Sequence, residues 1–166
     1  MKVKEVMTGG THTCAPETSL AEAAWLMWEY DCGALPVLDL ERKVVGMITD
    51  RDICFGATTK SRMPSGVSVA EVITGQVFAC GPDDDVHEAL KTMSRARVRR
   101  LPVIAGDGTL RGILSMNDVV LKAEDGGGER RHGITYGDVV RTYKAICEHA
   151  PPSRVAGRPG QRAATA

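Results

Sequence analysis

Apolar residues follow two different patterns along the first 125 residues of the chain, helical spacing and short continuous runs. In two segments they recur every three or four residues, which places them on one face of a helix. These positions are Leu20, Ala23, Ala24, Met27 and Tyr30 within 19–31, and Val86, Ala89, Leu90 and Met93 further along. Each helical segment precedes two short apolar runs separated by polar residues, a pattern typical of paired strands. The runs are ALPVL at 34–38, VVGMIT at 44–49, LPVI at 101–104 and LRGILS at 110–115.

The two sets of elements are copies of one unit, because the chain matches itself at an offset of 66 residues without a gap. Identical residues at this offset include Val6 and Val72, Thr8 and Thr74, Pro16 and Pro82, Glu22 and Glu88, Met27 and Met93, Gly46 and Gly112, and Asp52 and Asp118. A short first strand is expected near 13–15 and near 77–80. A second helix is expected from Asp50 and from Met116 onward. Each unit therefore reads strand, helix, strand, strand, helix.

Two such units are expected to pack on each other about a pseudo-twofold axis, because each is too small to cover both faces of its own sheet. The predicted fold is α+β, with a first domain at 1–62 and a second at 63–125. Residues 126–166 are predicted to hold a flexible linker, a C-terminal helix and a disordered tail. Apolar residues at helical spacing indicate that helix, namely Val139, Tyr143, Ile146 and Cys147.

Charge and cysteine content narrow the class of protein. The formal net charge is zero, although residues 126–166 carry seven Lys or Arg against three Asp or Glu. Residues 1–125 are therefore mildly acidic and offer no broad cationic face for nucleic acid. No segment reads as a signal peptide or membrane span, so we expect a cytoplasmic protein with reduced cysteines. Cys14 and Cys80 are also 66 residues apart and are expected to fill equivalent core positions.

One polar motif ends the last strand of both units, GMITDRDI at 46–53 and GILSMNDV at 112–119. In each motif a hydroxyl at the strand end is followed three residues later by a carboxylate. The hydroxyl lies where free N–H groups of the next helix suit a phosphate or another anion. The carboxylate can accept hydrogen bonds from both hydroxyls of a ribose. The motif therefore indicates a nucleotide contact in each unit.

The same spacing is also that of a capping box, in which the two residues only close the start of a helix. The ordinary helix starts of this chain use Glu at the third position, Glu22 after Ser19 and Glu88 after Asp85. Glu reaches back to the backbone well, and the shorter Asp is expected to be less suited to that task. The sequence therefore favours the ligand role for at least one of the two motifs.

The ordered features resemble the tandem cystathionine-β-synthase (CBS) domain pair, or Bateman module, over residues 1–125. They are VMT, PETSLAEAAWLM, GALPVLD and VVGMITDRDI in the first copy, and VIT, GPDDDVHEALKTM and VRRLPVIAGDGTLRGILSMNDVV in the second. The resemblance implies a regulatory sensor that binds an adenosine-containing ligand in a cleft between the units: AMP, ADP, ATP, NAD(H) or S-adenosylmethionine. Such a module needs no obligatory cofactor and signals by a conformational change.

The ligand-binding residues that the resemblance implies come from both units; they are Thr13, Gly33, Ala34, Thr49, Arg51, Asp52, Arg99, Arg100, Ser115 and Asp118. The two strand-end hydroxyls are assigned to phosphate or ribose and the two following Asp residues to the ribose diol. Arg99 and Arg100 precede a strand where similar modules carry basic residues that face phosphates, whereas Gly33 and Ala34 leave room for a base or ribose. Arg97 fits a solvated helix end equally well. The two sites should therefore differ, and a phosphorylated ligand should favour the pocket that the arginines reach.

No motif indicates an enzyme, because the chain has no nucleophile elbow, P-loop lysine, Rossmann glycine fingerprint or metal-ligand cluster. Trp25 and Trp28 predict a covered face on the first helix. That face is either a homodimer surface or a packing surface for residues 134–150. The resemblance favours neither alone, although modules of the family commonly dimerise through these helices. The alternatives to a sensor are a ligand-free dimeric module that binds a target protein, and a nucleic-acid-associated regulator that uses the basic tail.

Overall fold

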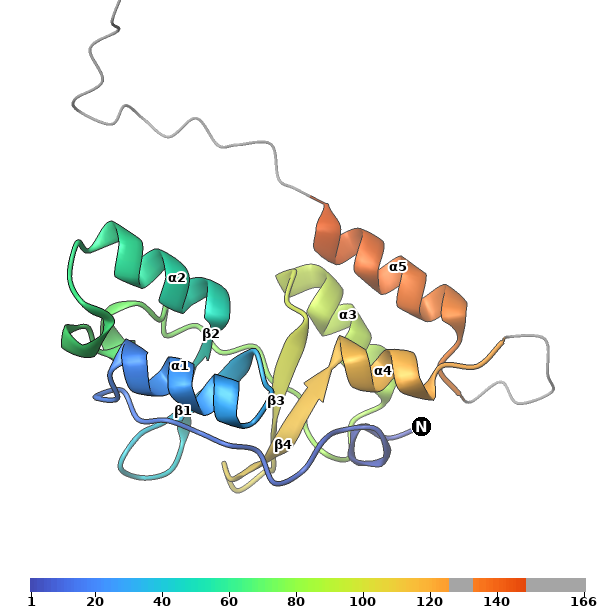
Figure 1. The fold of residues 1–166 in the computed structure, drawn as a ribbon. Helices are drawn as coiled ribbons and strands as arrows, with labels where there is room; N and C mark the ends of the chain where they lie inside the picture. The colour runs from blue at the N-terminus through green and yellow to red at the C-terminus, as the bar shows by residue number, and fades with distance from the viewer. Residues whose placement is uncertain (126–132, 149–166) are drawn as a thin grey trace, which may run out of the picture.

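The structure, a computed structural model, describes residues 1–125 and 133–148 (Figure 1). Two similar units lie side by side, each built of a helix, a two-stranded antiparallel hairpin and a second helix. The elements are α1 (Leu20–Glu29), β1 (Ala34–Leu38), β2 (Val44–Thr49) and α2 (Asp50–Thr59), then α3 (Val86–Ala96), β3 (Arg100–Ile104), β4 (Leu110–Ser115), α4 (Met116–Lys122) and α5 (Tyr136–Cys147). Single 3₁₀ turns lie at Val3–Glu5, Pro64–Gly66 and Val69–Glu71. The α+β fold of two repeated units is therefore confirmed.

The two hairpins have the same register, which shows that the repeat in sequence is a repeat in structure. Leu35 pairs with Ile48 in the first and Leu101 with Leu114 in the second. Each hairpin also has an irregularity at the same place, between Val37 and Leu38 and at the equivalent pair of β3. The predicted strands and the helices that follow them are confirmed at these positions.

The first strand predicted for each unit is reduced to a single parallel bridge, Cys14 with Val37 and Cys80 with Val103. The Cys14 N–H donates to the carbonyl of Pro36 at 3.1 Å, and the Leu38 N–H donates back to the carbonyl of Cys14 at 2.9 Å. The next donor in this ladder would be residue 16, which is Pro and has no N–H. Pro82 ends the equivalent strand of the second unit in the same way, so the proline that both copies share limits this strand to a single bridge.

Each unit exchanges its N-terminal segment with the other. Val3 belongs to the core around α3, and its N–H donates to the carbonyl of Asp84 at 3.0 Å. Val69, its equivalent, belongs to the core around α1, and its N–H donates to the carbonyl of Thr18 at 2.8 Å. These two contacts match residue for residue at the 66-residue offset, as an approximate twofold axis requires. The predicted division of the chain after residue 62 stays a prediction.

Equivalent cysteines lie in the two cores, as the sequence predicts. Cys14 is 7% exposed and Cys80 is 8% exposed. Burial raises the pKa of the Cys14 thiol to about 11 and that of the Cys80 thiol to about 12. Both side chains are therefore protonated at neutral pH and act as small apolar groups.

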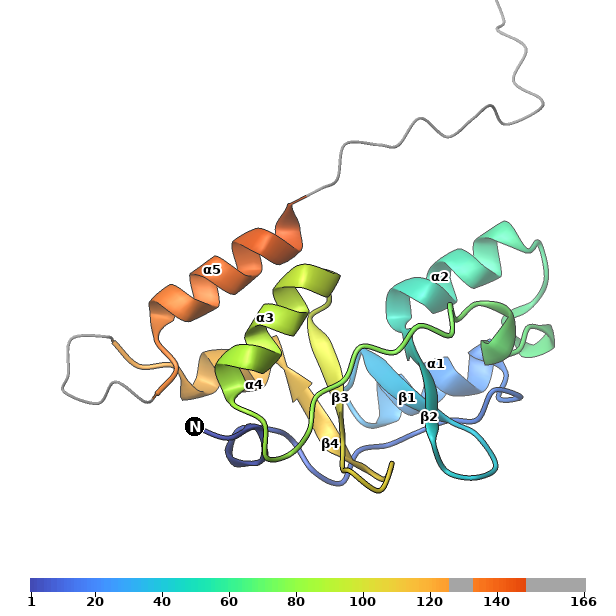
Figure 2. The same ribbon diagram turned by 180° about the vertical axis from the view of Figure 1, so that it is seen from behind.

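The predicted C-terminal helix is confirmed as α5, which packs on α3 and α4 of the second unit (Figure 2). Ile134, just before it, is 1% exposed and belongs to the second core, and Tyr143 and Ile146 pack against that core. Of the two alternatives for the tryptophan face, packing against this helix is wrong, because α5 lies on the second unit and Trp25 and Trp28 lie exposed on α1 of the first. The predicted linker and disordered tail lie outside the described residues. None of the described helices is long and apolar enough to cross a membrane.

Candidate functional site

The two strand-end motifs form capping boxes at the starts of α2 and α4. The Thr49 N–H donates to Oδ2 of Asp52 at 2.9 Å, and the Asp52 N–H donates to Oγ1 of Thr49 at 3.2 Å. In the second unit the Ser115 N–H donates to Oδ2 of Asp118 at 2.7 Å, and the return bond to Ser115 Oγ is 3.3 Å long. The motif therefore has a structural role in both units.

The expectation that Asp closes such a box poorly is wrong. A third box, formed by Thr135 and Asp138 at the start of α5, also uses Asp. At α1 and α3, by contrast, the expected Glu does not bond back: Ser19 only accepts from the N–H of Glu22, and Asp85 accepts from the N–H of His87. The carboxylate one turn into the helix lies close enough to the cap N–H that the shorter side chain suffices.

The two capping carboxylates differ in their second oxygen. Oδ1 of Asp118 accepts from the hydroxyl of Thr8 at 2.8 Å, a contact between the first segment of the chain and α4. The bonds given for Asp52 use only its Oδ2. Asp52 thus keeps one carboxylate oxygen free of partners within the described residues, whereas Asp118 uses both.

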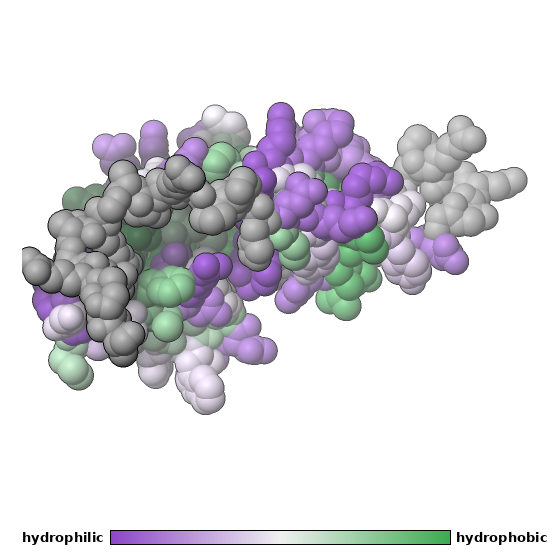
Figure 3. Space-filling view, turned by 90° about the horizontal axis from the view of Figure 1, so that it is seen from above, coloured by the Kyte–Doolittle hydropathy of each residue, from purple (hydrophilic) through white to green (hydrophobic). Residues whose placement is uncertain are grey.

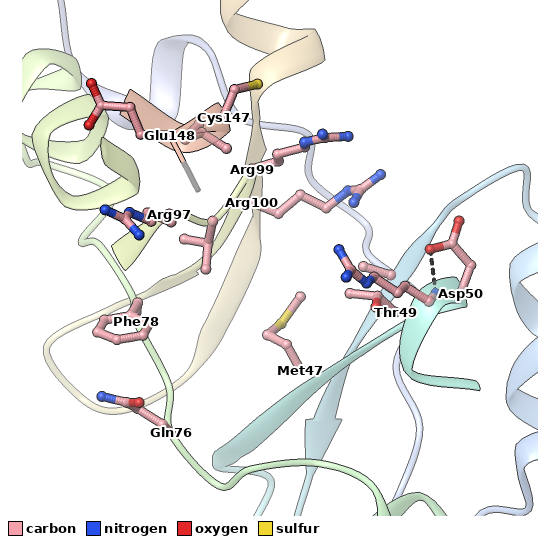
Figure 4. A pocket seen from close by; sticks show the side chains of 14 residues that line it. Met47, Thr49, Asp50, Gln76, Phe78, Arg97, Arg99, Arg100, Cys147 and Glu148 are labelled. Carbon is pink, nitrogen blue, oxygen red and sulfur yellow. Dashed lines mark hydrogen bonds between the residues drawn. The ribbon is translucent and has the colours of Figure 1, made fainter. Parts of the chain in front are cut away.

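A cavity of about 700 Å³ lies between the two units and the end of α5 (Figure 4). Its lining residues are Ala34, Met47, Thr49, Asp50, Arg51, Gln76, Phe78, Arg97, Val98, Arg99, Arg100, Ile146, Cys147 and Glu148. Figure 4 shows the arginines that follow α3 on one side and Thr49 and Asp50 on the other, with Arg100 extended toward them. We call this space the first cavity.

The first cavity is strongly cationic. Four arginines line it against two carboxylates, those of Asp50 and Glu148. Arg97 caps the end of α3 in a left-handed conformation, with φ of 55°, and the chain turns there. Arg99, just before β3, and Arg100, the first residue of β3, then lie beside the cavity. In the described part of the chain, the arginines that form ion pairs are Arg62, Arg111 and Arg141, none of which lines this cavity. The four lining guanidinium groups are therefore available to an anion.

A second cavity, of about 420 Å³, lies on the other side of the approximate axis. Its lining residues are Thr8, Gly9, Gly10, Thr11, His12, Tyr30, Asp31, Cys32, Gly33, Ala34, Arg100, Ile113, Ser115, Asn117 and Asp118. The rings of His12 and Tyr30 stack there with centroids 3.3 Å apart. The Thr11 hydroxyl is buried and has no hydrogen-bond partner among residues 1–125 and 133–148. This cavity is smaller than the first and has fewer cations.

The two cavities are equivalent sites, each assembled from both units. Residues of the first cavity at 76, 78 and 97–100 become, at the 66-residue offset, residues 10, 12 and 31–34 of the second. Likewise Met47, Thr49 and Arg51 become Ile113, Ser115 and Asn117. Each cavity thus combines the helix start of one unit with the segments that precede the hairpin in the other.

Because each cavity draws on both units, the residues that the sequence singles out are divided between the two cavities. Those in the first cavity are Ala34, Thr49, Arg51, Arg99 and Arg100, and those in the second are Gly33, Ala34, Arg100, Ser115 and Asp118. Thr13 and Asp52 line neither cavity. Sequence reasoning missed Phe78 and Thr11, which the offset could have revealed had the equivalent loops been paired across the axis. It also missed Ile146 and Cys147, because nothing in the repeat indicates where α5 ends.

The family model of the CBS domain matches the chain at residues 3–56 and 69–125. The chain therefore belongs to the CBS domain family, as a tandem pair. It is 32% identical over 119 residues to the CBS domain-containing protein YhcV of Bacillus subtilis, with 72% of this chain and 83% of that protein covered. A CBS pair thus accounts for most of YhcV.

Two solved structures of CBS proteins with bound ligands resemble this one. The CBS domain pair of protein MJ0100, in complex with 5′-methylthioadenosine and S-adenosyl-L-methionine, has a TM-score of 0.66 and 25% identity, with 73% of this chain and 98% of that chain covered. CBSX2 in complex with AMP has a TM-score of 0.61 and 25% identity, with 87% and 97% covered. Among the described residues of the present chain, no group of three or more His, Cys, Asp or Glu is placed to hold a metal ion.

Proposed function

We propose that this protein is a non-enzymatic regulatory module that binds a phosphate-bearing adenosine ligand in the first cavity and signals through a change in the relation of its two units. The observation that carries the proposal is the cavity itself, which lies between the units and holds four arginines that form no ion pair with any described residue. A phosphate recruits such guanidinium groups through paired, charge-assisted hydrogen bonds. The complexes of MJ0100 with 5′-methylthioadenosine and S-adenosyl-L-methionine and of CBSX2 with AMP support an adenosine ligand.

The residues that the sequence singles out have the following roles in this proposal, with Asp52 and Thr13 acting from outside the lining of the cavities. Arg99 and Arg100 bind the phosphate from the second unit, and Arg51 approaches it from α2. The Thr49 hydroxyl binds phosphate or ribose, and Asp52 offers the ribose the oxygen that its capping box leaves free. The base lies toward Ala34, where a small side chain leaves room. Ser115 and Asp118 have the equivalent roles in the second cavity, and Thr13 is a further candidate contact outside both.

The ligand would act as a bridge between the two units. Its phosphate binds Arg99 and Arg100 at the entry to β3, while its ribose binds the start of α2, so occupancy favours one arrangement of the units over others. A target protein, or the second subunit of a homodimer formed through the helices, would read that arrangement. All five cysteines are free thiols, which supports a reducing, cytoplasmic setting.

Calorimetric titration with AMP, ATP, NADH and S-adenosylmethionine tests the proposal. We expect saturable binding of a phosphate-bearing ligand, and we expect Arg99→Gln to raise its Kd about tenfold, the value of one charge-assisted hydrogen bond. Arg111→Gln is the matched control, since Arg111 lies in the same unit on β4, pairs with Asp107 and lines neither cavity. Equal affinities of the two variants, or no binding of any ligand, would overturn the proposal.

A ligand-free interaction module is the second candidate, and one observation favours it. Trp25 is 55% exposed and Trp28 is 85% exposed on α1, and no described helix covers them. Exposed tryptophans are typical anchors of protein interfaces. If no nucleotide binds, sedimentation of the wild type and of Trp28→Ser decides whether this face forms a homodimer.

A further inference from the structure

One residue of each unit lines both cavities, and these two residues are equivalent. Ala34 starts β1 and Arg100 starts β3, at the 66-residue offset, and each borders the first and the second cavity. A position shared by two sites that a twofold axis relates must lie near that axis. The first unit places a methyl group there and the second places a guanidinium group. The centre between the two cavities therefore holds a single cation.

The glycine beside Arg100 makes room for that cation. A Cβ atom on Gly33 would lie 3.1 Å from Nη2 of Arg100 and 3.3 Å from Oδ2 of Asp50, so any other residue would crowd both groups. Gly33 lines the second cavity, whereas Asp50 lines the first. Figure 4 shows the Arg100 side chain extended from β3 toward Asp50. The guanidinium group thus lies at the boundary and can serve a ligand on either side.

The two cavities depend on Arg100 to different degrees. The first has three further arginines, at 51, 97 and 99. The described residues that line the second include no other Lys or Arg, but they include the carboxylates of Asp31 and Asp118. When Arg100 turns toward a phosphate in the first cavity, the second keeps two carboxylates without a guanidinium group. Its potential then favours a cationic ligand and disfavours a second phosphate.

We propose that Arg100 is a shared specificity residue that couples the two cavities: a phosphate-bearing ligand in the first makes the second selective for an adenosine ligand with a positive charge and no phosphate. This inference rests on the proposed function of the first cavity. Because coupling free energies are reciprocal, the cationic ligand must strengthen phosphate-ligand binding by the same factor. The chain would then report the joint presence of two ligands of opposite charge.

Three probes with a common adenosine core test the coupling by calorimetry. AMP carries phosphate, S-adenosylmethionine carries a net positive charge, and 5′-methylthioadenosine is neutral. We expect the wild type to bind one AMP per chain, and saturating AMP to lower the Kd of S-adenosylmethionine about fivefold, with the reciprocal effect on AMP. The Kd of 5′-methylthioadenosine should change less, because the neutral probe does not respond to the charge of the second cavity.

Arg99 and Arg100 provide a matched pair of variants, since Arg99 lines only the first cavity. Arg99→Gln should weaken AMP binding and keep the coupling factor near its wild-type value. Arg100→Gln should weaken AMP binding and bring the coupling factor close to one, and Arg100→Lys, which keeps the charge, should retain part of the coupling. Far-ultraviolet circular dichroism verifies that each variant folds.

The outcomes separate the two proposals. Two equal AMP sites per chain, competition between AMP and S-adenosylmethionine for one site, or a coupling factor unchanged in Arg100→Gln would overturn the role of Arg100 and leave the proposed function standing. A wild type that binds none of the phosphate-bearing ligands AMP, ATP and NADH overturns both.

Discussion

The two units share a scaffold and differ in what covers it. Their hairpins have the same register, their second helices start with the same capping box, and a buried cysteine lies at the same place in each core. In the second unit, however, α5 packs on α3 and α4, whereas α1 of the first unit carries two exposed tryptophans. The repeat therefore fixes the inside of each unit, and the residues that differ between the copies give each unit its own outer surface.

The residues on the outer helices explain why α5 packs on the second unit. Lys91 and Ser94 of α3 occupy the positions of Trp25 and Trp28 in the repeat, and they lie in a groove beside Asp138 and other residues of α5. Small or flexible side chains there admit a neighbouring helix, whereas the corresponding positions of the first unit carry two large, exposed indole rings. Seen from above, the side of the second unit is mainly hydrophilic with one hydrophobic patch (Figure 3).

The largest expected effect comes from removing the anchor of α5. Ile134→Ala should lower the free energy of unfolding by about 3 kcal/mol, because the side chain is almost fully buried in the second core and leaves a cavity there. Urea unfolding gives the magnitude, and hydrogen exchange should show that α3 loses protection more than α1. Val140→Ala is the control, since Val140 lies on α5 but is 57% exposed; equal losses in the two variants would contradict the anchoring role.

The two capping carboxylates should differ when each is removed. Asp52→Ala should lower the free energy of unfolding by about 1 kcal/mol, the usual contribution of a helix cap. Asp118→Ala should cost about 2 kcal/mol, because the Thr8 hydroxyl also loses its acceptor. Urea unfolding of both variants, with AMP calorimetry on the same samples, separates the roles: lost binding with the fold intact supports the ligand role of that residue, and a change in stability alone supports capping.

The third box makes α5 sensitive to acid. Burial works to raise the pKa of Asp138, but hydrogen bonds from the Thr135 hydroxyl and N–H, with the nearby His87 and Arg141, hold that pKa below its ordinary value of 3.8. Since the folded-state pKa is depressed, the stabilisation is present above about pH 4 and is lost as the pH falls through the folded-state pKa. Asp138→Asn should lower the free energy of unfolding by about 1 kcal/mol at pH 7. It should also reduce the further loss of stability as the pH falls below about 4. Unfolding of the wild type and of Asp138→Asn from pH 7 to pH 3 measures both effects, and the same dependence of stability on pH in the two proteins would refute the assignment.

The smallest effect on stability is expected at the tryptophan face. Trp28→Ser, which installs the residue found at position 94, should change the free energy of unfolding by less than about 0.5 kcal/mol, because the ring is 85% exposed. Sedimentation velocity then measures what this face does in solution. A shift toward monomer in the variant supports a homodimer through α1, and an unchanged profile removes that interpretation.

Local patterns predicted most of the fold. Helices follow from apolar residues at helical spacing, strands from short apolar runs around polar turns, and caps from a few neighbouring residues, so the repeat at 66 residues predicts the same elements twice. The errors also have local causes. Short first strands were expected near 13–15 and 77–80, where the structure has a single bridge each. Asp was expected to close a capping box poorly, whereas three helices start with such a box.

The sequence alone determined the two units, their hairpins, the polar ends of β2 and β4, and a group of arginines before β3, because each of these depends on residues close together in the chain. Only the tertiary structure decided which partners meet. It set Arg99 opposite Thr49 of the other unit, laid α5 on the second unit, and placed Arg100 between two cavities. The physical reason is that an apolar period tells which face of an element is buried but not against which other face, and the exchange of segments about the axis settles that pairing.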